Sequence, residues 1–190
     1  MPEFPAHAQR YQDIHHCPRC GVAYRHGDFD AGACVFVCAP CGFAFYQNPV
    51  PAAVTVVVDP DRPGTVLMLR RRTPPRVGKW CVPGGFVGYG EMPAAAAARE
   101  TREEVGIDVD ITGLLDAGLV DYRFQGRQLC VLEIAFLAVP KAPIQVDRLS
   151  SPEASEVAFL RVDELLASPD LLAFPEQVRL LSMLRAPQQP

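Results

Sequence analysis

The 190-residue sequence lacks several features that would assign a protein to a broad class at once. No apolar run reaches the roughly 18 residues that a membrane-spanning helix needs, so we expect no membrane segment. Residues 1–16 have neither the basic start nor the apolar stretch of a secretory signal, and we therefore expect a cytoplasmic protein. The formal net charge of −4 provides no basic footprint for nucleic acid.

What is present favours a small globular protein. The chain is 49% hydrophobic and 21% charged, which suits a packed core. Its length allows one ordinary domain with a small addition. We expect an N-terminal arm at residues 1–16, a small module at 17–48, and a main domain at 49–190 that ends in a helix.

Four of the seven cysteines form two closely spaced pairs, Cys17 with Cys20 and Cys38 with Cys41. Two such pairs at this separation are typical of a four-thiolate zinc site. We predict a zinc ribbon of two short hairpins, which depends on Zn²⁺ because it is too small to fold on a core of its own. A disulfide framework and a thioredoxin-type redox pair are the alternatives. Nothing indicates an oxidising compartment, and no βαβ pattern surrounds the pairs.

The remaining thiols and the nearby histidines have less definite roles. Cys34 could replace Cys38 as a ligand or could be a small buried residue. Cys81 and Cys130 lie in apolar contexts and are predicted to pack in the core. The pair at positions 15 and 16, two histidines, could assist a metal or form a solvated lead-in.

A glycine-rich loop precedes an acidic helix in the stretch 85–107. Pro93 suits a first helical position, five alanines follow it, and Gly106 is a suitable helix end. Within this helix, three glutamates at offsets i, i+3 and i+4 share one face: Glu100, Glu103 and Glu104. Their carboxylates are suitable ligands for a hard divalent cation, although a solvated run of charge is the alternative.

This stretch resembles the Nudix box, a glycine followed at fixed spacings by Glu, Arg-Glu, Glu-Glu and Gly. The residues in register are Gly85, Glu91, Arg99, Glu100, Glu103, Glu104, Gly106 and Ile107. Thr101 departs from the pattern, because an apolar residue is usual there. Residues 78–85 also resemble the segment that precedes the box. With the ribbon, the sequence is similar to the Nudix subgroup that includes NADH pyrophosphatases, but the Ser-Gln-Pro-Trp-Pro-Phe-Pro signature of that subgroup is missing.

The resemblance implies a chemistry and roles for individual residues. Glu100, Glu103 and Glu104 would hold Mg²⁺ or Mn²⁺, with a backbone carbonyl of Gly84 or Gly85 completing the coordination. Arg99 would pair with a box carboxylate such as Glu91 and hold the loop against the helix. Glu100 is the first candidate for the general base, and the alternatives in a later loop are Glu153 and Glu156.

Substrate contacts are predicted with less support. In the family, an arginine at the position of Arg71 often approaches substrate phosphates, although a solvated surface charge is the alternative. Trp80, the sole tryptophan, could stack on a base or pack half-buried, and Glu91 is a third candidate. Three residues in a predicted loop could line a nucleoside pocket or cap the sheet: Tyr122, Phe124 and Arg127.

The order of elements suits the α/β/α sandwich that the resemblance implies, with a mixed, curved sheet between two helices. We expect a β-hairpin from 53–58 and 65–70, strands at 107–111, 114–121 and 129–139, and a strand after residue 153. Helices are expected to start at residue 162 and to cover 176–184.

The hypothesis is a metal-dependent pyrophosphohydrolase that cleaves a nucleoside diphosphate linked to another moiety, with ADP-ribose or a dinucleotide such as NADH or FAD favoured. The alternatives are a nucleotide-sensing module without turnover and a ribbon-based adaptor for protein or RNA. The intact glutamates disfavour the first alternative and the charge pattern disfavours the second. The expected partner is a small nucleotide, and a homodimer is compatible with the ribbon.

Overall fold

The computed structural model describes the chain except for residues 1–13, 26, 125, 146–148, 150 and 185–190 and the side chain of residue 127. Most of the predicted N-terminal arm lies outside these described residues. Contacts divide the chain into two units, residues 1–50 with 121–131, and residues 51–120 with 132–190. In the part of the chain that the structure describes, no helix is both long and apolar enough to cross a membrane.

The first unit contains a three-stranded antiparallel sheet. Its strands are β1 (Phe29–Asp30), β2 (Val35–Val37) and β3 (Ala44–Tyr46), with β2 in the centre. Phe36 is buried, and the rings of Tyr24 and Phe29 lie 4.8 and 4.6 Å from its ring. This small aromatic cluster and the cysteines described below make up most of the buried material around the sheet.

Two further sheets lie mainly in the second unit, although the parts of β8 and β9 within residues 121–131 belong to the first. One has the order β7-β4-β9-β8, with β7 at Gly84–Phe86, β4 at Val50–Val57, β9 at Arg127–Pro140 and β8 at Val109–Phe124. The other has the order β10-β5-β6, with β10 at Ala154–Arg161, β5 at Thr65–Arg71 and β6 at Trp80–Cys81.

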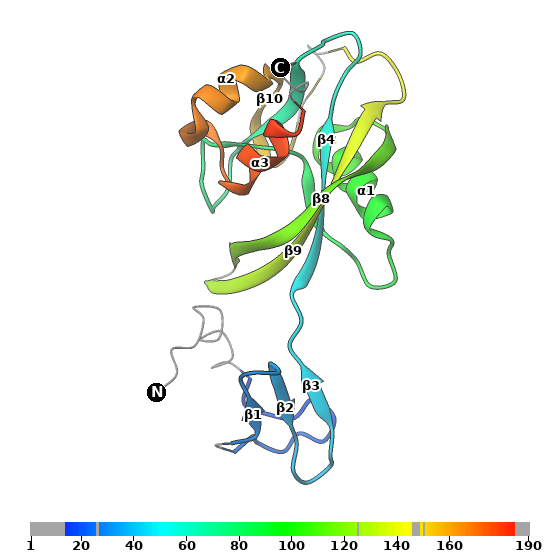
Figure 1. The fold of residues 1–190 in the computed structure, drawn as a ribbon. Coiled ribbons are helices and arrows are strands. Elements are labelled where there is room, and N and C mark those ends of the chain that lie inside the picture. The colour runs from blue at the N-terminus through cyan, green and yellow to red at the C-terminus, as the bar shows by residue number, and fades with distance from the viewer. Residues whose placement is uncertain (1–13, 26, 125, 146–148, 150, 185–190) are drawn as a thin grey trace, which may run out of the picture. The chain divides into compact units, whose positions relative to one another are not determined.

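Helices cover both sides of these strands (Figure 1). Helix α1 (Pro93–Val105) lies on one side, and α2 (Val162–Ala167) and α3 (Glu176–Ser182) lie on the other, joined by a 3-10 turn at Pro169–Leu171. The predicted α/β/α arrangement is therefore confirmed, although its strands belong to more than one sheet.

The predicted hairpin of residues 53–58 with 65–70 is wrong. The two segments form β4 and β5, but these belong to different sheets. Residues 52–57 are all buried, as are residues 66–69, which is the pattern of central strands covered on both faces. Each strand has two other neighbours, β7 and β9 for β4, and β10 and β6 for β5. The turn between them carries the chain from one sheet to the other.

The strands after α1 are longer than predicted. A single strand, β8, replaces the two predicted at 107–111 and 114–121, because Gly113 keeps a negative φ and the extended backbone continues through it. Tyr122 and Phe124 consequently lie in β8 rather than in a loop, with ring centroids 6.3 Å apart. Arg127 is the first residue of β9.

Small residues bring α1 close to the sheet. Ala96 and Ala97 of α1 are fully buried against Ala53 of β4. Thr101 is also fully buried, and its hydroxyl donates to the carbonyl of Ala97 at 2.8 Å and lies 2.5 Å from the hydroxyl of Thr55 on β4. A polar side chain is tolerated at this normally apolar position because its hydroxyl has partners.

Candidate metal and substrate site

The acidic helix begins and ends where its sequence predicts. Pro93 is its first residue, and Gly106 ends it in a left-handed conformation with φ of 77°, donating its N–H to the carbonyl of Arg102. Of the glutamates in the last two turns, Glu100 and Glu104 approach β7, whereas Glu103 is exposed and pairs with Arg99.

Strand β7 packs directly against that face. The backbone N–H of Gly84 donates to Glu104 Oε2 at 2.9 Å. A Cβ at Gly85 would lie 2.5 Å from the carboxyl carbon of Glu100, so a larger residue here would displace the Glu100 carboxylate from its position. The two consecutive glycines therefore place backbone against two of the predicted metal ligands, and the carbonyl of Gly84 stays a predicted ligand.

Arg99 gathers three carboxylates around one guanidinium. Its Nε and Nη2 donate to the two oxygens of Glu91 at 2.8 and 2.9 Å, which is a bidentate pair. Its Nη1 donates to Glu100 at 2.8 Å and to Glu103 at 2.9 Å. The predicted pairing of Arg99 with Glu91 is present, and Glu91 also accepts from the N–H of Gly88, which fastens the loop to the helix.

The local electrostatics differ between the carboxylates. Hydrogen bonds from Arg99 and from the Gly88 N–H lower the pKa of Glu91 to about 2. Burial, together with the negative charges of Glu153 and Glu100, raises the pKa of Glu104 to about 7, against the opposing effect of the Gly84 N–H. More negative charge converges here than one guanidinium balances, and a divalent cation would complement the excess.

The two candidate general bases from the later loop, Glu153 and Glu156, have different charged neighbours. Glu153 is exposed and near enough to Glu104 to raise its pKa. Glu156 forms an ion pair with Arg70 at 3.3 Å. The charge of Glu153 thus acts on a box glutamate, whereas the carboxylate of Glu156 is engaged by Arg70.

Two of the predicted substrate contacts, Arg71 and Trp80, lie in different environments. Arg71 is half-buried at the end of β5, and its positive charge favours the ionised form of Glu104, so it lies near the cluster. Trp80 is only 9% exposed and packs in the hydrophobic core with Val54 and Met68. This burial favours the packing role over stacking on a base.

Phe174 is a residue of this region that the sequence analysis did not identify. The guanidinium carbon of Arg71 lies 5.4 Å from the centre of its ring. The two residues are far apart in the sequence, and no motif connects them, so no sequence signal was available.

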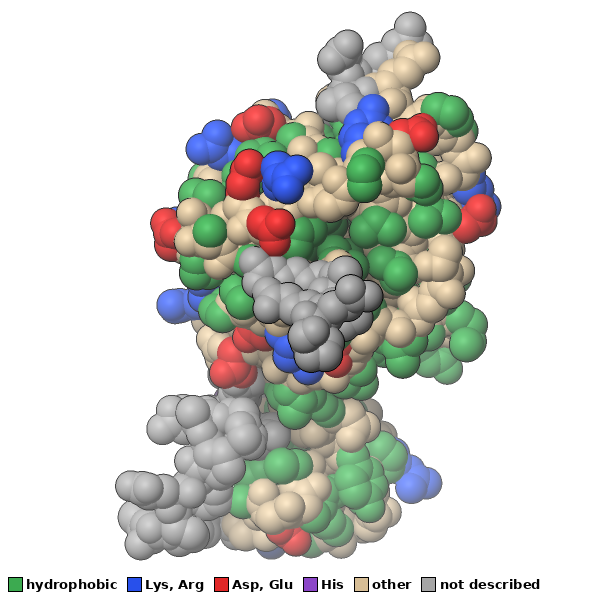
Figure 2. Space-filling view, turned by 45° about the horizontal axis from the view of Figure 1, so that its top comes forward, with side chains coloured by type: hydrophobic (Ala, Val, Ile, Leu, Met, Phe, Trp, Pro, Cys, Tyr) green, Lys and Arg blue, Asp and Glu red, His purple; other side chains and the backbone are tan. Residues whose placement is uncertain are grey.

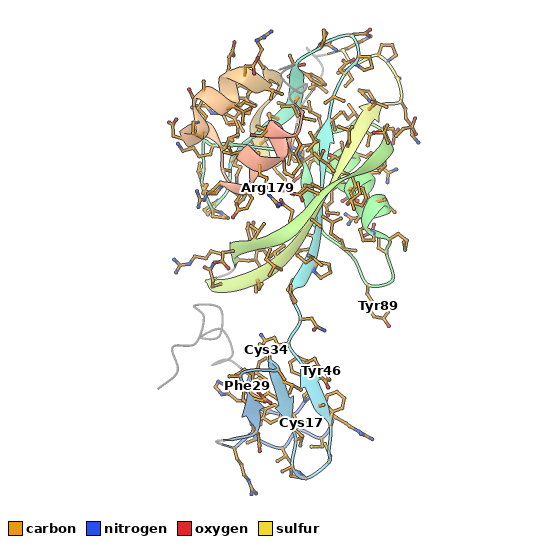
Figure 3. All side chains as sticks on the ribbon, in the orientation of Figure 1. Cys17, Phe29, Cys34, Tyr46, Tyr89 and Arg179 are labelled. Atoms are coloured by element: carbon orange, nitrogen blue, oxygen red, sulfur yellow. The ribbon has the colours of Figure 1, made fainter. Side chains whose placement is uncertain are left out.

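The four predicted cysteine ligands lie together in the first unit. The sulfurs of Cys17 and Cys41 are 3.8 Å apart, those of Cys20 and Cys38 are 3.6 Å apart, and all four lie within 4.8 Å of one another. Cys17 is labelled in Figure 3. The group could hold a metal ion, and no disulfide links its members.

Two similar turns build this cluster. Gly21 donates its N–H to the carbonyl of Cys17, and Gly42 donates to that of Cys38, at 2.9 and 2.7 Å. Both glycines have positive φ, 73° and 67°. Cys34 lies outside the group, and its sulfur contacts the carbonyl of Ala31 at 3.6 Å. Cys34 is half-buried, and its position favours the non-ligand alternative.

Comparisons with known proteins agree with this geometry. A family model described as the NUDIX domain matches residues 49–181. The chain is 33% identical over 100 residues to an NAD-capped RNA hydrolase of Caenorhabditis elegans, covering 53% of this chain and 25% of that protein. It is 33% identical over 73 residues to the ADP-ribose pyrophosphatase of Methanocaldococcus jannaschii, covering 38% and 41%. The chain thus spans less than half the length of these curated relatives.

A solved structure extends the similarity to nearly the whole chain. The crystal structure of a NUDIX hydrolase from Nitrosomonas europaea superposes with a TM-score of 0.66 at 25% identity, covering 92% of this chain and 94% of that one. The family match covers most of the chain, and the box residues Arg99, Glu100, Glu103 and Glu104 lie on α1. The chain therefore belongs to the Nudix family.

Proposed function

We propose that this protein is a metal-dependent pyrophosphohydrolase that cleaves a nucleoside diphosphate linked to another moiety. The observation that carries the proposal is the convergence of Glu91, Glu100 and Glu103 on Arg99, beside the partly buried carboxyl of Glu104. ADP-ribose or a dinucleotide such as NADH or FAD is the favoured substrate. The relatives support this class, since NAD and ADP-ribose both contain a nucleoside diphosphate.

Glu100, Glu103 and Glu104, with the carbonyl of Gly84, would hold Mg²⁺ or Mn²⁺. The donor set fits, because it is made of oxygens and carries excess negative charge. When bound, the ion supplies charge neutralisation for the diphosphate and lowers the pKa of a coordinated water.

The remaining side chains position these ligands and move the proton. Arg99 orients the carboxylates of Glu100 and Glu103 and ties them to the loop through Glu91. We assign the proton of the attacking water to a carboxylate oxygen of Glu100 or of Glu153. Glu91 contributes to the geometry of the loop, since both its oxygens are already hydrogen-bonded.

The cysteine cluster would hold a structural Zn²⁺. With Zn–S bonds of about 2.3 Å, neighbouring sulfurs of a tetrahedral site are about 3.8 Å apart. The observed separations of 3.8 and 3.6 Å fit this geometry. Thiolate ligands must remain reduced, which is the support for a cytoplasmic location.

The domain boundaries of the proposal are 17–48 for the ribbon and 49–190 for the hydrolase domain.

A homodimer is part of the proposal as well, and sedimentation equilibrium would test it. Acidic and basic side chains lie interspersed on the face shown in Figure 2, and a small nucleotide remains the proposed partner.

The test of the function is product release from a panel of nucleoside diphosphate derivatives with Mg²⁺, comparing wild type with Glu103→Gln. The panel contains ADP-ribose, NADH, FAD, a dinucleoside polyphosphate and nucleoside triphosphates. We expect cleavage of one or a few compounds that the variant abolishes. Tight binding of a compound without any cleavage by the wild type would overturn the hydrolase proposal in favour of a nucleotide sensor.

A further inference from the structure

The buried face of α3 contains one polar side chain, that of Gln177. This residue is only 2% exposed, and the other buried residues of the helix are leucines. Its carboxamide nitrogen Nε2 donates to the carbonyl of Trp80 at 3.2 Å, and its oxygen Oε1 accepts from the N–H of Val82 at 3.1 Å. The amide is oriented in this way because each of its atoms then has a suitable partner. A buried amide is costly unless it is hydrogen-bonded, so these two bonds explain a glutamine in an otherwise aliphatic position.

Gln177 binds the backbone where the chain passes from one sheet to another. Residues Trp80–Cys81 form β6, which pairs with β5, and residues Gly84–Phe86 form β7, which pairs with β4. Between the two strands the backbone cannot continue a single ladder, and its buried N–H and C=O groups need other partners. Gln177 is one such partner, and the N–H of Thr55 on β4 is another, donating to the carbonyl of Pro83 at 2.9 Å.

The same segment ends at the glycine that contacts the acidic helix. The N–H of Gly84 donates to Glu104 Oε2 at 2.9 Å. A Cβ at Gly84 would lie 2.5 Å from the carbonyl oxygen of Ala53 and 2.7 Å from the Cα of Val54, so this glycine packs directly on β4. Val82 and Gly84 are two residues apart, about 7 Å in an extended backbone. A displacement of the backbone at Val82 would therefore move the Gly84 N–H as well.

Gln177 and Glu104 hold this segment from opposite sides. Helix α1, which contains Glu104, and helix α3, which contains Gln177, lie on different sides of the strands (Figure 1). The residues before α3 strengthen the attachment, because the N–H of Ala173 donates to the carbonyl of Trp80 at 2.7 Å and Leu172 forms a parallel bridge with Trp80. The C-terminal part of the second unit is thus bonded to the strand that leads into β7.

We propose that Gln177 is a positioning residue for the metal site, which acts by fixing the backbone at Trp80 and Val82. With this backbone fixed, Gly84 keeps its N–H on the carboxylate of Glu104, and Glu104 keeps its place among the proposed ligands. The inference rests on the proposed function, because that carboxylate and the carbonyl of Gly84 are proposed ligands of Mg²⁺. It extends the site to a side chain on a helix outside the box.

The test compares the full-length wild type with Gln177→Met, which has a similar length and lacks the amide. The first measurement is amide hydrogen exchange at Gly84, expressed relative to the slowest amides of α1 in the same protein. The second is the affinity for Mn²⁺, followed by electron paramagnetic resonance. We expect relative exchange at Gly84 to be about tenfold faster in the variant. The affinity for Mn²⁺ should fall about tenfold, as for other partners of metal ligands.

Two further variants separate positioning from a general loss of stability. Leu165 of α2 is 2% exposed and packs in the same aliphatic cluster, and its side chain forms no hydrogen bond. Leu165→Ala should lower the melting temperature at least as much as Gln177→Met, yet leave relative exchange at Gly84 and the Mn²⁺ affinity within about twofold. Gln177→Glu keeps an oxygen that accepts from the N–H of Val82, so both quantities should lie between those of the wild type and Gln177→Met. If Gln177→Met does not fold, Gln177→Glu decides the test with the same direction of change.

Unchanged relative exchange at Gly84 in the Gln177 variants, or an equal change in Leu165→Ala, would overturn the inference. Faster exchange at Gly84 with an unchanged Mn²⁺ affinity would also overturn it, because Gln177 would then support the fold without positioning a metal ligand. Absence of Mn²⁺ binding by the wild type would overturn the proposed function instead. The exchange measurement needs no bound ion, and it would still decide whether Gln177 positions Gly84.

Discussion

The cysteine-bearing ribbon and the box-bearing unit obtain their structure from different sources. In the ribbon, the buried side chains are few, and two of the most deeply buried are Cys17 and Cys38 themselves. In the second unit, two clusters of aliphatic side chains fill the space between strands and helices. The proposed ribbon metal would thus maintain a fold, whereas the proposed box metal would take part in the chemistry of a fold that already exists.

This difference determines which metal ligands can be substituted without unfolding the unit that contains them. A ligand that supplies folding free energy cannot be removed without losing its module. A carboxylate on the surface of a formed helix can be neutralised while the helix remains, since the core behind it is unchanged. The following predictions test this contrast, from the largest expected effect to the smallest.

Removing a ribbon ligand should unfold the ribbon and leave the second unit folded. Structural zinc contributes on the order of 10 kcal/mol to small sites of this kind, far more than the small cluster around Phe36 can replace. For Cys38→Ser we expect loss of bound zinc and rapid amide hydrogen exchange over residues 14–46. Amide hydrogen exchange over α1 should stay as slow as in the wild type.

Cys34→Ser is the matched control, because the sulfur of Cys34 lies outside the cluster and contacts the carbonyl of Ala31. This variant should keep its zinc and its protected ribbon amides. A ribbon that stays protected in zinc-free Cys38→Ser protein would contradict the contrast between the two units.

Arg99→Lys should reduce turnover without unfolding the protein. A lysine cannot donate to Glu91, Glu100 and Glu103 from one planar group, so the proposed ligands lose their orientation. Partners of metal ligands typically account for about 10–100-fold in affinity or activity, and we expect a loss in this range with an unchanged far-UV spectrum. Arg102→Lys, on the exposed side of α1, should retain full activity; equal losses in both variants would argue against the Arg99 network.

The pH dependence of stability should reveal a partly buried carboxyl on β9 of the second unit, that of Glu133. Burial and the negative charges of Glu176 and Asp116 raise the pKa of Glu133 to about 7, against the effect of Arg179. Arg179, labelled in Figure 3, also pairs with Asp116 at 2.6 Å. Because the folded-state pKa is raised, this carboxyl favours the folded state below its unfolded pKa, and that contribution falls as the pH rises from about 4.5 to 7.

Glu133→Gln should therefore flatten the stability profile across this window. At pH 8 the variant should be more stable than the wild type by up to about 3 kcal/mol in the free energy of unfolding. Urea unfolding at several pH values measures this difference. Glu164→Gln, an exposed glutamate of α2, should follow the wild type, and a Glu133→Gln curve parallel to the wild type would disprove the assignment.

The smallest effect concerns the contact between α1 and β4. Thr101→Val removes the hydroxyl partner of Thr55 inside the core and should cost about 1–3 kcal/mol in unfolding free energy. The double variant Thr55→Val/Thr101→Val should lose less unfolding free energy than the sum of the two single variants, because it leaves no unpaired hydroxyl. Thr112→Val, at an exposed site, should change stability by less than about 0.5 kcal/mol; strict additivity of the buried pair would contradict the contact.

The features that could be predicted from the sequence are local ones. Helix α1 follows from Pro93 at its start and Gly106 at its end, and the cysteine cluster follows from spacing alone. In both cases the determining residues lie within a few positions of the structure that they specify. The pairing of Arg99 with Glu91 was predicted because both belong to one motif.

Features that depend on partners distant in the sequence were not predicted. The turn signals between β4 and β5 indicate a hairpin, but each strand has neighbours from elsewhere in the chain. The contact of Thr101 with Thr55 and the position of Phe174 beside Arg71 arise only when the elements pack. Sequence patterns encode which faces are apolar, and they do not specify which distant face covers them.

The most direct test of the different roles of the two metals is hydrolysis by zinc-loaded protein as Mg²⁺ is added. For the substrate found in the panel, the account predicts no cleavage before the addition, a saturable rise with Mg²⁺, and a flat response in Glu103→Gln. Ribbon amides should be protected throughout. Cleavage that proceeds at full rate with zinc alone, or that persists in Glu103→Gln, would contradict the assignment of chemistry to the box and of folding to the ribbon.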